Sequence, residues 1–598
     1  MDHPLVIKRL INRIIIYTNR LIAGNETRKI IVLSVLTGIL SGVLAVLVKR
    51  STIAVHWLVN LFNTIDWGNY FYFVSPLLGI SITVLIAHRL LKKKVSHGIP
   101  STIYAIIRKK SRLPFHATYS SMITSLFTVG FGGSVGLEGP SVSTGIAIGS
   151  VVGRFFNQNY KTTTVLLAAG AAGAISGIFS APVGAMIFVL EIFMFDFSAS
   201  FLLPVLLSSS MAALTSMFIY GKDAIFKFSV QSFAMKNIPL YIILGILCGM
   251  YSVYFVDVVK KVEKFSNKRK TRPWKRIIVY GIPLGWMIFF IPPLYGEGYE
   301  VITRIAGGDI KALVEHSIFY HQWNNGLLML VLIAGILFFK PWATSLTFAA
   351  GGVGGIFAPS FFAGGILGFF LLYILQQFAE WDQMAFANFT LAGMAGVMAG
   401  VMHTPLTAVF LVAELANGYN IFIPLMLTVA LSYATSRYFN PESIYQWQMK
   451  NEGLNVAGVK ESIISFSHHA KDILEKDFVP VYEDETLGSM IEKIKISRRN
   501  TFPVIDRENN FKGVLTIDQL KDYLFDRTKY DMPVKQLVQK PDTLIYPGNT
   551  LDYVSKQFQA TKQWNLPVVS KNGKYLGFVS RFKVMEKIKE TLLRENGF

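Results

Sequence analysis

Two short segments of the 598-residue chain contain the residues best suited to bind and move an ion. They read Gly136-Leu-Glu-Gly-Pro140 and Gly355-Ile-Phe-Ala-Pro359. A helix that starts in such a segment presents unpaired backbone N–H groups and the positive end of its dipole. Two such helix starts aimed at one point bind an anion through partial charges, so the anion can also leave. We therefore expect the two segments to form an anion site.

Glu138 is the only ionisable residue in these two segments. A carboxylate at the mouth of an anion site competes with the anion for the same N–H groups. A proton on that carboxylate would let it move aside, which links anion passage to protonation. An acid in the first turn of a helix can also serve only to stabilise the helix dipole. At membrane depth an ionisable side chain is functional by default, so we predict that Glu138 gates the site and binds the proton.

The two segments belong to matching halves of the chain. Gly170–Glu191 aligns with Gly393–Glu414 at an offset of 223 residues, with eight identities, and the two shorter segments align at an offset of 219. Matching segments interrupted by Gly and Pro indicate a transporter with its site at the interface of two repeats. Close packing of small residues explains the Gly-x-x-Gly spacing but not eight matches in register.

Composition divides the chain near residue 449. Of the first 449 residues 51 are charged, against 44 of the last 149. Of the net charge of +21, +17 lies in the apolar part, mostly in runs between apolar segments such as Lys92–Lys94 and Lys260–Arg276. Such runs mark cytoplasmic loops, so we expect a multi-pass protein of the plasma membrane with both termini cytoplasmic and no nucleic-acid partner. The single Cys248 excludes a disulfide framework and a thiolate zinc cluster.

The elements that must position the site are mostly apolar helices. Five segments are long and apolar enough to cross a membrane as tilted helices, at 30–48, 74–91, 239–259, 277–294 and 326–339. Four others are apolar but broken by Gly and Pro, at 130–153, 165–195, 343–378 and 389–437. Broken helices at membrane depth are tolerated where they are buried in protein or line a cavity, so these four indicate the substrate path.

The polar tail contains a second repeat, at an offset of 64 residues. We expect β-strands at Thr501–Ile505, Gly513–Thr516, Asn565–Val569 and Gly577–Ser580, and helices at Ile517–Phe525 and Phe582–Arg594. The whole chain then begins with a basic amphipathic segment on the membrane surface at 1–28. A membrane domain follows at 29–448, with halves at 29–220 and 239–448. A linker at 449–477 leads to two soluble units at 478–530 and 531–598.

On these motifs the sequence resembles the CLC family of chloride channels and chloride/proton antiporters. The two Gly-rich segments look like the family's G-x-E-G-P and G-x-F-x-P, and Ser96-His-Gly-Ile-Pro100 looks like a variant of G-S-G-I-P. The resemblance implies an all-α polytopic fold of two inverted, broken-helix repeats, assembled as a homodimer with one pore per subunit. It implies Glu138 as the gate and an anion site at His97, Gly98, Gly136, Gly139, Gly355, Ile356, Phe357 and Tyr445.

Three positions depart from the family pattern. His97 replaces a serine donor, so it is either an anion ligand or pH-sensitive element, or a histidine turned toward a neighbour. Leu137 stands where a basic residue is common. Ile192 occupies the place of the internal proton-accepting glutamate, which leaves Glu191 as a possible substitute, although its match with Glu414 is equally consistent with a structural role.

The tail resembles a pair of CBS domains, which often bind adenosine nucleotides. A Ser/Thr followed two residues later by an Asp would contact the ribose, and Thr516 with Asp518 fits that pattern. In the second unit Ser580 is followed by Phe582, so the acid is missing. The alternatives are one nucleotide site for ATP, ADP or AMP, or a purely structural pair.

The prediction is therefore a selective chloride transporter, with no required cofactor and no enzymatic activity. Intact Glu138 favours chloride/proton exchange, and Ile192 favours a passive, pH-gated channel. An intramembrane metalloprotease would need His residues spaced as in H-E-x-x-H, which the membrane part lacks. A cation transporter would need several midplane carboxylates. A fluoride exporter of this family would have methionine at the position of His97.

Overall fold

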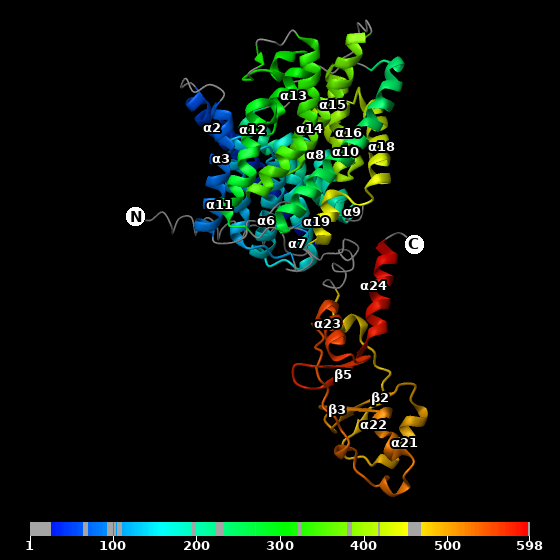
Figure 1. The fold of residues 1–598 in the computed structure, drawn as a ribbon. Coiled ribbons are helices and arrows are strands. Elements are labelled where there is room, and N and C mark those ends of the chain that lie inside the picture. The colour runs from blue at the N-terminus through cyan, green and yellow to red at the C-terminus, as the bar shows by residue number, and fades with distance from the viewer. Residues whose placement is uncertain are drawn as a thin grey trace. The chain divides into compact units, whose positions relative to one another are not determined.

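The computed structural model describes residues 26–63, 70–91, 100, 103, 111–193, 199–221, 233–268, 271–317, 319–320, 325–378, 386–416, 419–451 and 468–595. The chain forms two compact units, Met1–Val456 and Ala457–Phe598, and Figure 1 shows both as ribbons. The first unit is helical and the second contains all the named strands.

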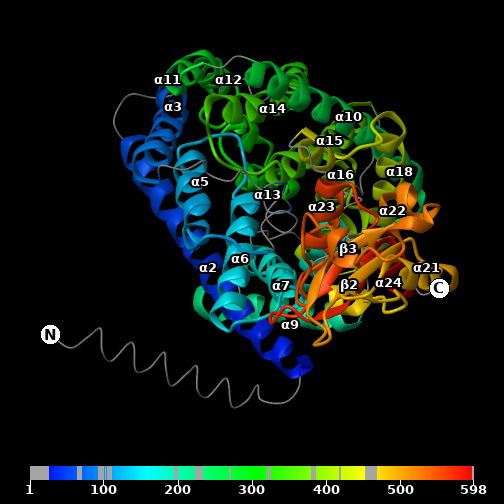
Figure 2. The same cartoon turned by 90° about the horizontal axis from the view of Figure 1, so that it is seen from below.

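The first half of the helical unit contains seven α-helices among its described residues. They are α2 (Glu26–Asn63), α3 (Tyr70–Leu85), α5 (Ser120–Gly130), α6 (Glu138–Phe155), α7 (Tyr160–Phe179), α8 (Pro182–Phe193) and α9 (Ala199–Tyr220). Helix α3 continues as a π-helical turn, η1 (Ile86–Leu91), and a 3₁₀ turn, η2 (Phe115–Thr118), precedes α5. Helix α2 packs along α5, α6, α7 and α9 (Figure 2).

The second half begins with a 3₁₀ turn, η3 (Met235–Asn237). It continues with α10 (Ile238–Lys268), α11 (Pro273–Arg276), the π-helical η4 (Ile277–Gly281), α12 (Ile282–Phe290), η5 (Pro292–Leu294), α13 (Tyr299–Ala306), η6 (Ile310–Leu313), α14 (Gly326–Ala350), α15 (Phe357–Phe378), α16 (Phe386–Met402), α17 (Pro405–Leu415), α18 (Phe422–Phe439) and α19 (Ile444–Asn451).

Seven helices in the described part of the chain are long and apolar enough to cross a membrane. They are Glu26–Val59, Tyr70–Arg89, Tyr160–Phe179, Phe201–Tyr220, Met235–Lys268, Gly326–Ala350 and Phe357–Gln377. Four of them contain most or all of a segment that the sequence predicts to span. The predicted span at 277–294 is wrong as a single α-helix, because a π turn precedes the nine-residue α12 and Pro292 begins a 3₁₀ turn.

Helix α9 was missed as a span because three serines interrupt its apolar residues. In the structure, two of the three hydroxyls have backbone partners. Ser208 Oγ donates to the carbonyl of Ala169 at 2.8 Å, and Ser209 Oγ donates to the carbonyl of Leu206 at 2.9 Å. A serine whose hydroxyl is satisfied inside the protein no longer opposes burial in an apolar helix.

The two halves of the helical unit have helix starts and close helix–helix contacts at equivalent positions. Pro182 and Pro405 are the first residues of α8 and α17, where a missing N–H costs nothing. Helix α6 packs on α7, and α15 packs on α16 in the same way. A Cβ on Gly145 would lie 2.2 Å from the carbonyl oxygen of Gly170, and one on Gly364 would lie 2.2 Å from that of Gly393. The sequence repeat is therefore a structural repeat.

The second unit consists of two α/β repeats. The first contains β1 (Val481–Tyr482), α21 (Leu487–Ile496), β2 (Thr501–Ile505), β3 (Phe511–Thr516) and α22 (Ile517–Leu524), and the second contains α23 (Leu551–Thr561), β4 (Asn565–Val569), β5 (Tyr575–Ser580) and α24 (Arg581–Glu595). Strands β2 and β3 pair antiparallel, as do β4 and β5, while β1 runs parallel to β2. The predicted strands are confirmed, except that β3 and β5 each start two residues earlier.

The segment before β1 belongs to the second repeat. Ala470 and Ile473, on the 3₁₀ turn η8 (Ala470–Ile473), are buried in the apolar core of that repeat. The backbone of Glu475 pairs with that of Phe578 in β5. Residues 470–475, expected from the sequence to be part of the linker, are thus an integral part of the second repeat, because their apolar side chains complete its core.

Candidate functional site

The two Gly-rich segments meet at a backbone-to-backbone contact. The N–H of Gly136 donates to the carbonyl of Gly355 at 2.9 Å, and the N–H of Gly355 donates to the carbonyl of Gly136 at 2.7 Å. A Cβ on Gly355 would lie 2.9 Å from the backbone nitrogen of Gly139. Only glycine permits this approach. The starts of α6 and α15, one from each half, are therefore held side by side.

Glu138 is the first residue of α6 and is 3% exposed. The hydroxyl of Tyr299 donates a hydrogen bond to its Oε1, while its Oε2 is buried without a partner. A Cβ on Gly136 would lie 2.0 Å from that Oε2, so the carboxyl group folds back over Gly136. A buried carboxyl oxygen without a partner requires a reason in a native structure, and a group that takes up a proton or gives way to an ion provides one.

Aromatic rings surround the start of α15. Phe357, its first residue, is buried, and its ring centroid lies 5.3 Å from that of Phe179 and 6.3 Å from that of Phe188. These rings come from α7 and α8 of the other half. Ile356 is also buried. The backbone N–H groups at the start of α15 thus face a low-polarity region, where partial charges act strongly on an anion.

Tyr445 lies in α19 and is buried. Its phenol is close enough to Glu138 for their charges to interact, so the structure brings the predicted tyrosine and glutamate to the same region. The predictions for His97 and Gly98 lie outside the described residues. The structure therefore gathers Glu138, Gly136, Gly139, Gly355 and the start of α15.

Three residues near the site are not predicted by the motifs of the sequence. Tyr299 bonds to Glu138, Glu297 Oε1 accepts the N–H of Leu137 at 2.9 Å, and Lys340 is fully buried in α14. The signals were present in the sequence. Lys340 is the only charged residue in the 25 residues of α14, and Glu297 lies between two glycines after an apolar run. An isolated charge in an apolar helix is a functional candidate, and that rule could have found Lys340.

Glu191 and Glu414 cap each other's repeats. The carboxylate of Glu191 accepts the N–H groups of Leu406 at 3.0 Å and Thr407 at 2.8 Å, at the start of α17. The carboxylate of Glu414 accepts those of Val183 and Gly184, at 3.1 and 2.7 Å, at the start of α8. Each acid thus satisfies the free N–H groups of the other repeat's helix. Ile192, next to Glu191, is buried in α8.

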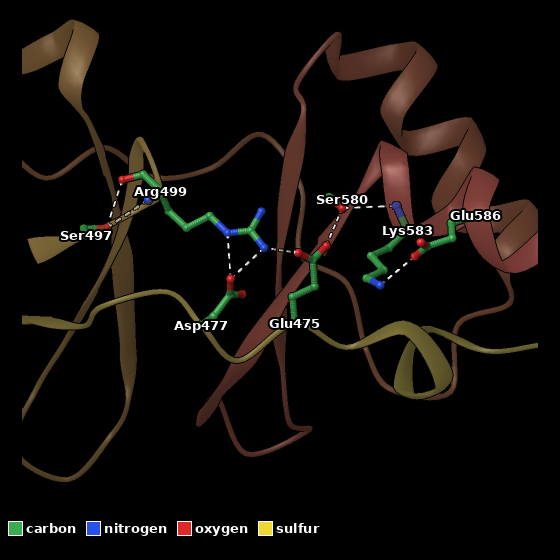
Figure 3. A network of polar contacts seen from close by, with 7 residues as sticks. All are labelled: Glu475, Asp477, Ser497, Arg499, Ser580, Lys583 and Glu586. Carbon is green, nitrogen blue, oxygen red and sulfur yellow. Dashed lines mark hydrogen bonds and ion pairs between the residues drawn. The ribbon is translucent and has the colours of Figure 1, made fainter.

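The two residues of the predicted ribose-binding pair have different partners in the structure. Thr516 caps α22 and shares its capping box with Gln519, whereas the side chain of Asp518 is 83% exposed and pairs with Lys521. Figure 3 shows instead that the buried Glu475 lies between Arg499 and Ser580 and bonds to both. The carboxylate that the sequence lacks beside Ser580 is therefore supplied from residues before β1.

Comparisons with known families agree with this architecture. The family model described as voltage gated chloride channel matches residues 78–437, and that of the CBS domain matches residues 470–526 and 534–590. The chain is 26% identical over 447 residues to the H⁺/Cl⁻ exchange transporter ClcA of Vibrio cholerae serotype O1 (strain M66-2), covering 71% of this chain and 90% of that protein. It is 26% identical over 480 residues to the chloride channel protein CLC-e of Arabidopsis thaliana, covering 72% and 64%.

Solved structures share the fold. A slow cyanobacterial Cl⁻/H⁺ antiporter aligns with a TM-score of 0.59 at 20% identity, over 72% of this chain and 98% of that one. A eukaryotic CLC transporter aligns with a TM-score of 0.56 at 18% identity, over 93% of this chain and 97% of that one. A CLC-type fluoride/proton antiporter aligns with a TM-score of 0.55 at 22% identity, over 70% and 97%.

Proposed function

The chain belongs to the voltage gated chloride channel family and ends in two CBS domains, and from that premise we propose that it exchanges chloride for protons across a membrane. The observation that carries the proposal is the partnerless, buried Oε2 of Glu138 at the point where α6 and α15 start. Relatives that align over most of their length are named H⁺/Cl⁻ exchange transporters, which supports the same activity.

The proposed cycle follows from competition for one set of N–H groups. The ionised carboxylate of Glu138 occupies the positive end of α6 and repels an anion. When Glu138 takes up a proton, it loses that attraction and swings away, and chloride binds to the N–H groups of Ile356 and Phe357 with the Tyr445 hydroxyl as a further donor. Loss of the proton returns the carboxylate and displaces the anion. One side chain thereby links the two ions.

Flux from chloride-loaded proteoliposomes tests this proposal. Valinomycin sets the membrane potential with potassium while electrodes record chloride and external pH together. Exchange requires proton movement against its gradient in a fixed ratio to chloride. Chloride efflux without proton movement would instead make the protein a passive channel, the alternative that Ile192 favours.

The acid that delivers protons from the other side is unassigned. Ile192 carries no proton, and both carboxylate oxygens of Glu191 accept hydrogen bonds from α17. A carboxylate fixed in this way is suited to join the repeats, which supports a structural role over that of a substitute proton site. The same side of the protein must then use another group or a chain of water molecules.

The proposal includes the assembly and the location of the protein. We place the protein in the plasma membrane as a homodimer, with both termini in the cytoplasm. Large apolar side chains of α9 and α18 remain exposed in the single chain, including Leu214, Phe218, Ile423 and Met426. Mass measurement in nanodiscs would distinguish a dimer from a monomer, and protease access to sealed vesicles would give the orientation.

Adenosine nucleotide binding to the CBS pair is a separate proposal. Thr516 with Asp518, and Ser580 with Glu475, are the two hydroxyl–carboxylate candidates for the ribose. Calorimetry with ATP, ADP and AMP on the full protein and on the variants Asp518→Ala and Ser580→Ala assigns the site by which variant loses binding. Absence of binding in the unmodified protein would leave the pair with a structural role.

A further inference from the structure

A four-residue strap, Gly296–Tyr299, makes two polar contacts at the start of α6 and one with Lys340 of α14. The carbonyl of Gly296 accepts from Lys340 Nζ at 3.2 Å, Glu297 Oε1 accepts the N–H of Leu137 at 2.9 Å, and the Tyr299 hydroxyl donates to Glu138. Gly296 and Gly298 both have positive φ angles, 59° and 82°, which favour glycine. The backbone on both sides of Glu297 is thus shaped to place its side chain.

Glu297 is more exposed to solvent than Glu138. Glu138 is 3% exposed, whereas Glu297 is only partly buried. Their carboxyl groups approach the same turn, because Glu297 bonds to the N–H of Leu137 and Glu138 is the next residue. A second carboxyl group, more exposed than that of Glu138, therefore lies at the turn where α6 starts.

Lys340 can supply a positive charge that compensates the negative charge of the two carboxyl groups. It is fully buried, donates to Ser134 Oγ at 2.9 Å, and its ammonium lies 4.5 Å from the ring centre of Phe362. The charge of Glu297 interacts with those of Lys340 and Glu138. Among the described residues, the phenol of Tyr299 also faces both carboxyls and that of Tyr445 faces Glu138.

Charge counting favours one proton on the two carboxyls. With Lys340 protonated, the three groups are neutral when one proton is shared and carry one negative charge when none is present. A neutral arrangement avoids the cost of an uncompensated buried charge. The proton can then reside on either carboxyl at little electrostatic cost, which is the condition for rapid transfer between them.

We propose that Glu297 is a second proton-carrying residue of the transport cycle, which passes its proton to Glu138 and regains one from solvent. The proposal rests on the chloride/proton exchange proposed above. In the transfer step the O–H bond of the Glu297 carboxyl breaks, an O–H bond forms on the Glu138 carboxylate, and the negative charge moves from Glu138 to Glu297. Solvent then protonates Glu297, so one proton enters and no other reactant is needed.

The variant Glu297→Gln separates this role from that of a helix cap. Glutamine keeps an oxygen that accepts the N–H of Leu137 but cannot carry a proton. The paired proteoliposome assay is run over a range of external pH on the unmodified protein, Glu297→Gln, Glu297→Asp, and the control Glu300→Gln, an exposed carboxyl in the first turn of α13. We expect Glu297→Gln to lower proton flux by about tenfold or more relative to chloride flux, Glu297→Asp to restore coupling, and the control to behave as the unmodified protein.

The outcomes distinguish the inference from the function on which it rests. No proton movement in the unmodified protein overturns both. Normal coupling and an unchanged pH profile in Glu297→Gln overturn the inference and leave exchange intact. Equal losses of both fluxes, not restored by aspartate, make Glu297 only a positioning residue and also overturn it. If Glu297→Gln does not fold, the double variant Glu297→Leu/Lys340→Met, which replaces the interacting charges by apolar groups, is measured with the same expectations.

Discussion

At the residue scale, the carboxyl group of Glu138 accepts a hydrogen bond from the hydroxyl of Tyr299. The carboxyl group covers Gly136, whose lack of a side chain provides the space. Its motif identified Glu138 in the sequence, because G-x-E-G-P is specific. Tyr299 lies 161 positions further along the chain, and no local pattern connects the two.

Substitution of Glu138 by glutamine is expected to abolish proton transport while chloride transport continues. Glutamine has the shape of the protonated carboxyl but cannot release a proton, so the gate no longer alternates between two charge states. The paired chloride and pH recording in proteoliposomes checks this outcome. Proton flux that survived the substitution would remove Glu138 from the proton path.

Substitution of Tyr299 by phenylalanine is expected to extend chloride transport to more alkaline pH. In the proposed cycle the ionised carboxylate closes the site, and the hydroxyl stabilises that state. A hydrogen bond to a charged group contributes about 1.5 kcal/mol, equivalent to a shift of about one pH unit. Chloride flux measured against pH checks the shift. Tyr251→Phe is the matched control, because its hydroxyl donates to the carbonyl of Leu337, away from Glu138.

At the element scale, the repeats are joined through helix starts and helix ends. Glu191 at the end of α8 binds the start of α17, and Glu414 at the end of α17 binds the start of α8. Sequence alignment of the repeats predicted that the two acids are equivalent. It could not predict that each one contacts the other repeat, because that depends on how the halves pack.

Replacement of Glu191 by alanine is expected to destabilise the membrane unit without uncoupling it. Loss of a cap that satisfies two N–H groups and a threonine hydroxyl costs about 1–2 kcal/mol, and Glu414→Ala is expected to have a similar effect. Thermal unfolding in detergent measures the first effect, and the proton-to-chloride ratio measures the second. A Glu191→Gln protein that folds normally but moves no protons would show instead that Glu191 carries them.

The hairpin between β2 and β3 provides a pH-dependent contribution to the stability of the tail. A side-chain hydrogen bond from Asn510, backbone N–H groups and Lys512 lower the pKa of Asp506 from 3.8 to about 2. Because the folded pKa is the lower one, this contribution is complete above about pH 4 and is lost as the pH falls through 2. Asp506→Asn should therefore lower the unfolding midpoint of residues 457–598 at pH 7, and the difference should vanish below pH 2. A constant difference across that range would exclude ionisation as its cause.

At the scale of the whole molecule, the sequence predicted two units, the internal repeat in each, and most element boundaries in the tail. These features follow from local composition and periodicity. The prediction of the membrane spans was less complete. Helix α9 contains serines whose hydroxyls are hydrogen-bonded inside the protein, and the span at 277–294 contains a π turn. The site was only partly predicted, since Glu297, Tyr299 and Lys340 become neighbours of Glu138 only in the folded chain.

An ion pair between the two repeats of the tail stabilises its fold. The guanidinium of Arg499, after α21, bonds to Glu475 and Asp477, and Glu475 bonds to Ser580 (Figure 3). Arg499→Met keeps an extended apolar side chain over Phe478 but leaves the buried Glu475 without its cation. Because the pair is only partly buried, we expect a loss of about 2 kcal/mol in the unfolding free energy of residues 457–598, measured by urea denaturation. An unchanged midpoint would show that the ion pair contributes nothing.

The reciprocal carboxylates have a consequence for how the protein is made. Until the second half emerges from the ribosome, the start of α8 has no partner for its N–H groups, and Gly136 has none for its backbone. We therefore expect the first half to be incompletely folded until the second half is made. Two separately translated halves should accumulate only when both are synthesised in the same cell. A gene split between the two halves should then still yield a functional protein.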